Sequence, residues 1–317
     1  MLLSNFIRLI QNENMKLYSK KATWVMIGIL AIIVLAVGLI LRFMDDNNLK
    51  EYGDDWREEL QVENASVQND NGDYTEASYR VNIEKNKYHL ENDIKPQSYG
   101  AMQFVYDNIG LAMLISLFTI IVAAGILANE FQWGTIKLLL IRPVTRLKIL
   151  ASKYVAVLIY ALTLLVFLVV FSWIVGALLF GINGLNPSAV MYDINGYKQV
   201  SLLPEIIEGF GYRMVNLVMM ATFAFMISAV FRNTSMAIGI AIFLMLAGNT
   251  IIPFVSQYSW AKYILFANTD LSQYQSGGHP LLDGMSLSFS ISVLLVYYVI
   301  FIVASWLSFT KRDIAGQ

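Results

Sequence analysis

Long apolar stretches separated by polar segments form the dominant pattern of this chain. A helix that spans a membrane needs about 20 largely apolar residues. Six stretches meet this length: Ala22–Phe43, Ile109–Ala128, Tyr154–Phe180, Met214–Phe231, Ser235–Pro253 and Phe289–Phe309. The first is longer than the apolar core of a signal peptide, which has about 7–15 residues. The pattern therefore predicts an all-α integral membrane protein with six transmembrane helices.

The polar segments predict further helices. Apolar and polar residues alternate at the start of the chain, so residues 1–21 are expected to form an amphipathic interfacial helix, the alternative being a flexible leader. Residues 44–108 carry apolar side chains at helical spacing, followed by a second helical run from Thr75 to Asp93. We expect an outer helical hairpin there, although a partly ordered polar loop fits as well. Residues 254–288 are expected to form an outer re-entrant segment.

The composition requires lipid as a solvent for this chain. Hydrophobic residues make up 57% and charged residues 14%, against about 45–50% and 25% in soluble domains. Cysteine is absent and only two histidines occur, which leaves no thiolate or histidine metal cluster and no cysteine nucleophile. We therefore expect no catalytic residues, no metal site and no cofactor in this chain, and we do not expect an enzyme.

The distribution of charge predicts the orientation. If the N-terminus is cytoplasmic, the inner segments hold 12 basic and three acidic residues, and the outer segments hold 10 basic and 20 acidic residues. An excess of Lys and Arg marks cytoplasmic loops. We expect a multi-pass protein of the cell membrane with both termini in the cytoplasm, including the tail 310–317.

Energy for transport would have to come from elsewhere. The predicted spans carry no ionisable residue in their middle, whereas ion-coupled transporters need such groups to bind the driving ion. The chain also lacks the glycine-rich loop that binds ATP phosphates. A transporter built this way would depend on a partner that hydrolyses ATP.

The inner loop 129–153 is where such a partner would attach. Ile136, Leu139 and Leu140 lie at helical spacing beside Lys137, and Pro143 is expected to end this short amphipathic helix. Thr145 would then cap the next helix. The alternative is a basic loop that only sets the topology and touches anionic lipid headgroups.

A resemblance to a known family rests on this loop. Its motif residues are Asn129-Glu130, Gly134-Thr135, Lys137, Arg142-Pro143-Val144-Thr145-Arg146 and Ser152-Lys153. In this order they resemble the cytoplasmic loop of the type-2 ABC transporter permeases, and Phe309–Ile314 is similar to the usual ending of that family. The resemblance implies a membrane domain paired with a second permease copy or a related permease, and two separate ABC ATPase subunits that bind ATP and Mg.

The resemblance implies that the loop residues couple the membrane domain to the ATPase: Glu130, Gly134, Thr135, Lys137, Leu139, Leu140, Arg142, Pro143, Arg146 and Lys153. Glu130 could instead cap the next helix or pair with Arg146 or Lys137. Asn216 and Asn249 lie inside predicted spans, where they would form interhelical hydrogen bonds or line a translocation path.

Two functions follow as hypotheses. The first is the permease subunit of an ATP-binding cassette transporter that exports an amphiphilic substrate, such as a peptide antibiotic, a lipid-like molecule or a drug. The second is a non-transporting membrane sensor or scaffold that reads an extracellular ligand through the acidic outer segment. No nucleic-acid partner is expected.

Overall fold

The chain folds almost entirely into helices, as the computed structural model shows for residues 2–44, 50–69, 76–136, 144–193, 196–275 and 278–311. The longer helices are α1 (Leu2–Tyr18), α2 (Lys21–Met44), α3 (Trp56–Asn69), α4 (Glu76–Glu91), α6 (Ala112–Gln132), α8 (Arg146–Phe180), α9 (Leu202–Phe231), α10 (Thr234–Val255) and α12 (Leu287–Lys311). The shorter elements are α5 (Ala101–Asp107), η2 (Asn108–Leu111), β1 (Ser188–Asp193), β2 (Gly196–Ser201), η3 (Ala261–Tyr263), α11 (Leu265–Thr269) and η4 (Leu271–Tyr274).

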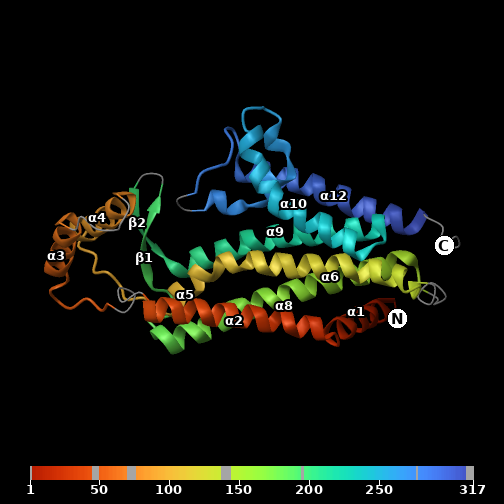
Figure 1. The fold of residues 1–317 in the computed structure, drawn as a ribbon, viewed down its shortest axis with the longest axis horizontal. Coiled ribbons are helices and arrows are strands. Elements are labelled where there is room, and N and C mark those ends of the chain that lie inside the picture. The colour runs from red at the N-terminus through yellow and green to blue at the C-terminus, as the bar shows by residue number, and fades with distance from the viewer. Residues whose placement is uncertain are drawn as a thin grey trace.

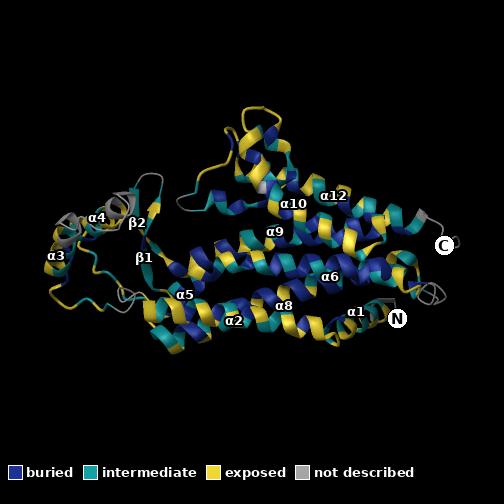
Figure 2. Ribbon diagram, in the orientation of Figure 1, coloured by how far each residue is buried: buried dark blue, intermediate teal, exposed yellow. Residues whose placement is uncertain are grey.

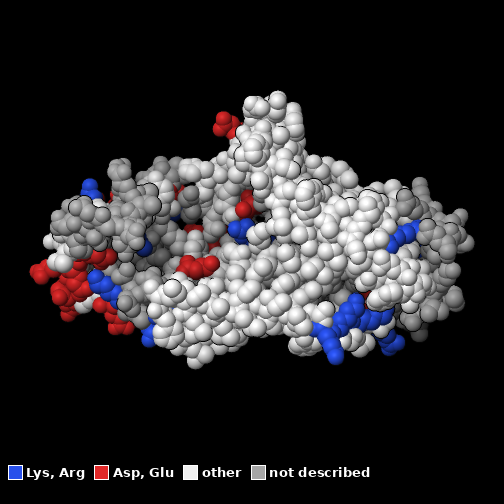
Figure 3. Space-filling view, in the orientation of Figure 1, with Lys and Arg blue, Asp and Glu red and all other residues white. Residues whose placement is uncertain are grey.

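The membrane-length helices lie side by side along the longest axis of the molecule: α2, α6, α8, α9 and α12 (Figure 1). The start of α1 and the end of α12 lie at one end of this bundle, which we call the proximal end. Helices α3 and α4 and the antiparallel pair β1–β2 lie at the opposite end, which we call the distal end (Figure 1). Acidic side chains gather at the distal end and basic ones near α1 at the proximal end (Figure 3).

Five helices are long and apolar enough to cross a membrane: Lys21–Met44, Ala101–Gln132, Arg146–Phe180, Leu202–Phe231 and Leu287–Thr310. The corresponding apolar part of α10, Thr234–Gly248, is shorter. The mostly helical membrane architecture expected from the sequence is thus confirmed in its coarse form. The sixth crossing, the interfacial position of α1 and the outer hairpin remain predictions.

Helices α6 and α9 form the centre of the bundle, whereas α2 and α12 lie at its edge. About two thirds of the most apolar window in Ala101–Gln132 is buried (67%), against 17% in α2, and Figure 2 shows the same contrast. Small side chains on α6, such as Ala124 and Ala128, are fully buried and let α9 approach closely. There the Ser228 hydroxyl donates to the Ala124 carbonyl at 2.6 Å and accepts from the Ala128 N–H at 3.1 Å.

Helix α5 packs just as tightly against α8. A Cβ added to Gly176 would lie 2.9 Å from the Cα of Ala101, so only glycine allows this separation. The Ala101 N–H donates to the Gly181 carbonyl at 3.0 Å. The start of α5 and the distal end of α8 therefore form one unit.

The helices extend beyond the apolar stretches in two places. Helix α8 begins at Arg146, eight residues before the predicted span, and α9 begins at Leu202, twelve residues before it. Residues 181–201, to which no element was assigned from the sequence, contain β1 and β2, in which Ser188 pairs with Ser201 and Asp193 with Gly196. The long helices and this strand pair position the two regions described below.

Candidate functional site

Four charged side chains from three helices meet at the proximal end of the bundle. Lys153 of α8 places its Nζ 2.8 Å from Oε2 of Glu13 in α1 and 2.5 Å from Oε1 of Glu130 in α6. Lys16 of α1 lies 2.8 Å from Oε1 of Glu13 and 3.6 Å from Oε1 of Glu130. We call Glu13, Lys16, Glu130 and Lys153 the proximal ion cluster.

Three members of the cluster are withdrawn from solvent. The side chain of Lys153 is fully buried (0% exposed), and those of Glu13 and Glu130 are 8% and 12% exposed. A buried ammonium group is tolerated only when carboxylates surround it, because the loss of hydration otherwise costs several kcal/mol. Burial alone would raise the pKa of Glu13, but Lys153 and Lys16 outweigh this effect and hold that pKa below its ordinary value.

A cavity of about 380 Å³ lies beside the cluster. Its lining includes Glu13, Lys16, Lys20, Asn129, Glu130 and Trp133. Burial lowers the pKa of Lys20, and the positive charge of Lys153 lowers it further, while Glu13 and Glu130 oppose both effects. Oε2 of Glu130 is buried without a hydrogen-bond partner in the described part of the chain. The cluster therefore holds one carboxylate oxygen that is buried but not hydrogen-bonded to a described residue.

The residues around the cluster explain how the connection from α6 to α8 is held. Trp133 is the C-cap of α6, and Gly134 follows with a positive φ of 69°, a conformation that favours glycine and ends helices. Thr135 Oγ1 donates to the Glu130 carbonyl at 3.4 Å. Thr145 occupies the N-cap position of α8 as expected, but its side chain accepts no capping hydrogen bond.

The structure gives Glu130 partners other than Arg146, whereas Lys137, the second predicted partner, lies outside the described residues. Glu130 pairs with Lys153 and Lys16, whereas Arg146 donates from Nη1 to the Thr310 carbonyl of α12 at 3.1 Å. Arg146 points elsewhere, and Lys153, two turns into α8, lies against the end of α6 instead. Arg146 thus ties the start of α8 to the end of α12.

A second contact joins the proximal ends of α6, α9 and α12. The guanidinium group of Arg232, just after α9, lies 4.6 Å from the ring centroid of Phe131. The Phe131 ring in turn meets the Phe309 ring of α12 edge-on, at 6.2 Å between centroids. Together with the ion cluster, these contacts connect five helix ends on one side of the bundle.

The remaining predicted residues fall in two groups. Lys137, Leu139, Leu140, Arg142 and Pro143 lie outside the described residues, as does the side chain of Asn249. Asn216 of α9 donates from Nδ2 to the Thr269 carbonyl of α11 at 3.1 Å. That contact between two helices fits the hydrogen-bonding interpretation of Asn216.

The sequence did not indicate a site role for Glu13 and Lys16, which fall in the predicted amphipathic interfacial helix 1–21. One signal was present: Glu13 is the single acidic residue among the first 44 residues. A lone carboxylate in a basic segment that precedes a membrane span indicates a specific partner, and the structure identifies that partner as Lys153.

Comparison with known proteins decides the family. Residues 78–315 match the model of a family described as "Protein of unknown function (DUF2705)". The chain belongs to the DUF2705 family. It is 40% identical to the uncharacterized protein YhcI of Bacillus subtilis (strain 168) over 98% of this chain and 100% of YhcI. It is 34% identical to the uncharacterized membrane protein YdbK of the same organism over 64% of this chain and 79% of YdbK.

These matches correct the family named from the loop motif. The matching family is DUF2705 and not the type-2 ABC transporter permeases. Short combinations such as Gly-Thr and Pro-Val-Thr-Arg carry little information, because a helix end and a capped helix start in any membrane protein favour the same residue types. The apolar helices, together with the name of YdbK, indicate a multi-pass membrane protein of the DUF2705 family.

Proposed function

We propose that this DUF2705 protein is the membrane-spanning permease subunit of a transporter that is energised by a separate ATPase of the ATP-binding cassette type. The observation that carries the proposal is the proximal ion cluster, in which a fully buried Lys153 joins α1, α6 and α8. We expect an amphiphilic substrate, because the exposed faces of α2 and α12 are apolar and suit a molecule that enters from the bilayer.

The cluster gives the proximal end the stiffness that coupling requires. A partner that pushes on the connection between α6 and α8 displaces Glu130 and Lys153 together. Because Glu13 is bonded to the same ammonium group at 2.8 Å, α1 follows, and Arg146 carries α12 along through Thr310. Force applied at one connection thus moves several helices as one body, as rigid-body switching requires.

The topology favours a cytoplasmic proximal end. The start of α1 and the end of α12 both lie there, which supports an even number of crossings, and we include α10 as the sixth. Basic side chains gather at this end and acidic ones at the other (Figure 3), which agrees with the excess of Lys and Arg in cytoplasmic loops. The connection between α6 and α8 then faces a cytoplasmic ATPase.

Coexpression with the neighbouring genes tests the proposal. We expect an ATPase to copurify with the full chain and substrate to stimulate its ATP hydrolysis. Arg146→Glu should reduce this stimulation on the order of tenfold, because it breaks the bond to α12 at the docking end. Lys87→Glu on α4 provides a matched charge reversal at the distal end and should leave the stimulation unchanged. If no ATPase copurifies, or both variants behave alike, the proposal fails.

A further inference from the structure

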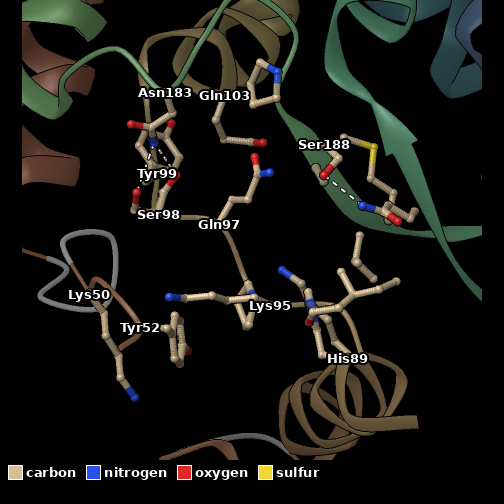
Figure 4. A pocket seen from close by; sticks show the side chains of 18 of the residues that line it. Lys50, Tyr52, His89, Lys95, Gln97, Ser98, Tyr99, Gln103, Asn183 and Ser188 are labelled. Atoms are coloured by element: carbon tan, nitrogen blue, oxygen red, sulfur yellow. Dashed lines mark hydrogen bonds between the residues drawn. The ribbon is translucent and has the colours of Figure 1, made fainter. Parts of the chain in front are cut away.

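A second cavity, of about 500 Å³, lies at the distal end and has no part in the coupling proposal. Figure 4 shows that its walls come from separate elements: Lys50 and Tyr52 precede α3, His89 belongs to α4, Lys95 to Tyr99 lead into α5, and Ser188 begins β1. Pockets for small molecules have similar volumes, about 300–1,000 Å³. We call this space the distal cavity.

The charge of the distal cavity is opposite to that of its surroundings. Residues 44–108 hold 15 acidic and six basic residues, yet the described lining contains three lysines, Lys50, Lys85 and Lys95, and a single carboxylate, Glu63. Glu63 Oε2 lies 3.3 Å from the Nζ of Lys50, so that pair is neutral. Two positive charges, those of Lys85 and Lys95, remain in the cavity.

Neither of these two lysines has a carboxylate within 4.0 Å among the described residues. Half of the basic residues of this acidic segment therefore face one space. Two of them have no carboxylate at ion-pair distance in the described part of the chain, although Asp107 acts on Lys85 from farther away. Such an arrangement raises the local concentration of anions.

The uncharged lining supplies hydrogen-bonding groups. His89 is 5% exposed, and its Nδ1 lies 2.8 Å from the Ile94 carbonyl. A carbonyl can only accept, so Nδ1 carries the proton of the neutral ring, and Nε2 is left as an acceptor. Burial lowers the pKa of His89 and the charge of Lys85 lowers it further, although the hydrogen bond to Ile94 opposes both. The Ser188 hydroxyl accepts from Gln199 Nε2 at 2.9 Å and retains its own proton for a ligand.

We propose that the distal cavity binds a small hydrophilic ligand through a phosphoryl group held by Lys85 and Lys95. A phosphomonoester carries a charge of about −1.5 to −2 at pH 7, which matches the two unpaired lysines, whereas a carboxylate would neutralise only one. Ser188 donates to a phosphoryl oxygen, and His89 accepts from a hydroxyl group of the same ligand. Water-soluble phosphomonoesters and lipid headgroups share this chemistry.

Calorimetric titration tests the proposal with glycerol 3-phosphate and the full chain in phosphatidylcholine nanodiscs. We expect saturable binding of one ligand per chain. Lys85→Gln and Lys95→Gln should each weaken it about tenfold. Lys87→Gln is the matched control, because Lys87 lies on the same helix as Lys85, pairs with Glu91 at 3.6 Å and does not line the cavity. This control should bind like the wild type.

Two further arms identify the source and the chemistry. If nanodiscs that contain phosphatidic acid abolish the binding of glycerol 3-phosphate, the lipid headgroup occupies the same site and is the ligand. If the lipid has no effect, the ligand is water-soluble. Absence of saturable binding to either probe overturns the proposal. Equal losses in Lys95→Gln and Lys87→Gln also overturn it, as does binding of glycerate as tight as that of glycerol 3-phosphate. This test does not depend on any ATPase, so its outcome is independent of the coupling proposal.

Discussion

Substitution of Lys153 by Met tests how the proximal ion cluster is stabilised. Met keeps most of the length of the lysine side chain and removes its charge, so Glu13 and Glu130 lose the ammonium group that lies 2.8 and 2.5 Å away. Removal of one partner from a buried ion pair costs about 3–5 kcal/mol, because the remaining charge stays buried. Lys16 still contacts both carboxylates, but its side chain is 45% exposed and solvent screens it. We therefore expect a loss of about 3 kcal/mol in the free energy of unfolding.

The assay is thermal unfolding of the full chain in detergent. About 3 kcal/mol corresponds to a decrease in Tm of roughly 6–12 °C, if each kcal/mol shifts the Tm by about 2–4 °C. Lys148→Met is the matched control on the same helix, since Lys148 has no ion pair among the described residues. This control should change the Tm by little more than the error.

A triple variant separates charge from packing. Adding Glu13→Gln and Glu130→Gln to Lys153→Met removes the uncompensated charge and keeps the side-chain volumes. The cost of breaking a buried ion pair comes from the charge that is left uncompensated, so most of the lost stability should return once both carboxylates are replaced by neutral amides. The reasoning is refuted if Lys153→Met unfolds at the same temperature as Lys148→Met, or if the triple variant is no more stable than the single one.

Three further predictions concern packing, a buried amide and pH. Gly176→Ala should lower the free energy of unfolding by about 1–3 kcal/mol, because the added Cβ would press on the backbone of α5. Gly211→Ala is the control on α9, where a Cβ meets open space, and it should raise the free energy of unfolding by about 0.5–1 kcal/mol. Asn268→Ala should lower the free energy of unfolding by about 1–3 kcal/mol, because its fully buried amide donates to two carbonyl groups and accepts from Ser290. Chemical unfolding of the wild type and of these three variants measures the differences. The pKa of Glu13 lies below its ordinary value of 4.5 when folded, so its stabilising effect is complete above that pH and is lost as the pH falls through the lowered pKa. The difference in Tm between the wild type and Glu13→Gln should accordingly shrink on acidification, and a difference that grows contradicts the sign of this shift.

The apolar pattern of the sequence predicted the membrane-spanning architecture because lipid imposes a minimum length on each helix. It predicted the ends of the helices less well. Helix α9 begins twelve residues before its apolar stretch, in a part that carries Glu205 and Arg213. Arg213 pairs with Asp270 at 3.1 Å. A charged residue can thus belong to α9 outside its apolar stretch, because another segment supplies the opposite charge.

The sequence carries a local signal for the strands β1 and β2. Asn195-Gly196 is a typical turn dipeptide of a β-hairpin, and Tyr192 and Tyr197, which flank it, pair across the strands. The ring centroids of these two tyrosines lie 5.4 Å apart. Short strands between two membrane spans are easily overlooked, because the apolar pattern of the spans is much stronger.

The two candidate sites could not be predicted from the sequence for a different reason. Glu13 and Lys153 are 140 residues apart, and the lining of the distal cavity extends from Lys50 to Leu202. No local pattern marks such pairs. The sequence did indicate that Glu130 and Lys153 belong to a functional region. It predicted that they contact a partner protein, and it gave no sign that they contact each other.

Helix α8 connects the two regions physically. It has 35 residues and is therefore about 52 Å long at 1.5 Å per residue, well above the bilayer core of about 30 Å. Lys153 lies near its proximal end, and just beyond its distal end Asn183 donates to the carbonyl and the hydroxyl oxygen of Ser98 at 2.7 and 3.0 Å.

One wall of the distal cavity thus moves with α8, because Ser98 and the start of α5 are bonded to the residues that follow this helix. The opposite wall, with Lys85 and His89, belongs to α4. A tilt of α8 imposed at the ion cluster would move the Ser98 side of the cavity relative to α4, whereas Lys95 would stay with Lys85, because the preceding Ile94 is bonded to His89 of α4. A ligand shifts such an equilibrium only by the difference between its affinities for the two states. A phosphoryl group that contacts both lysines and Ser188 would have that difference, because Ser188 follows α8 along the chain whereas the lysines lie beside α4.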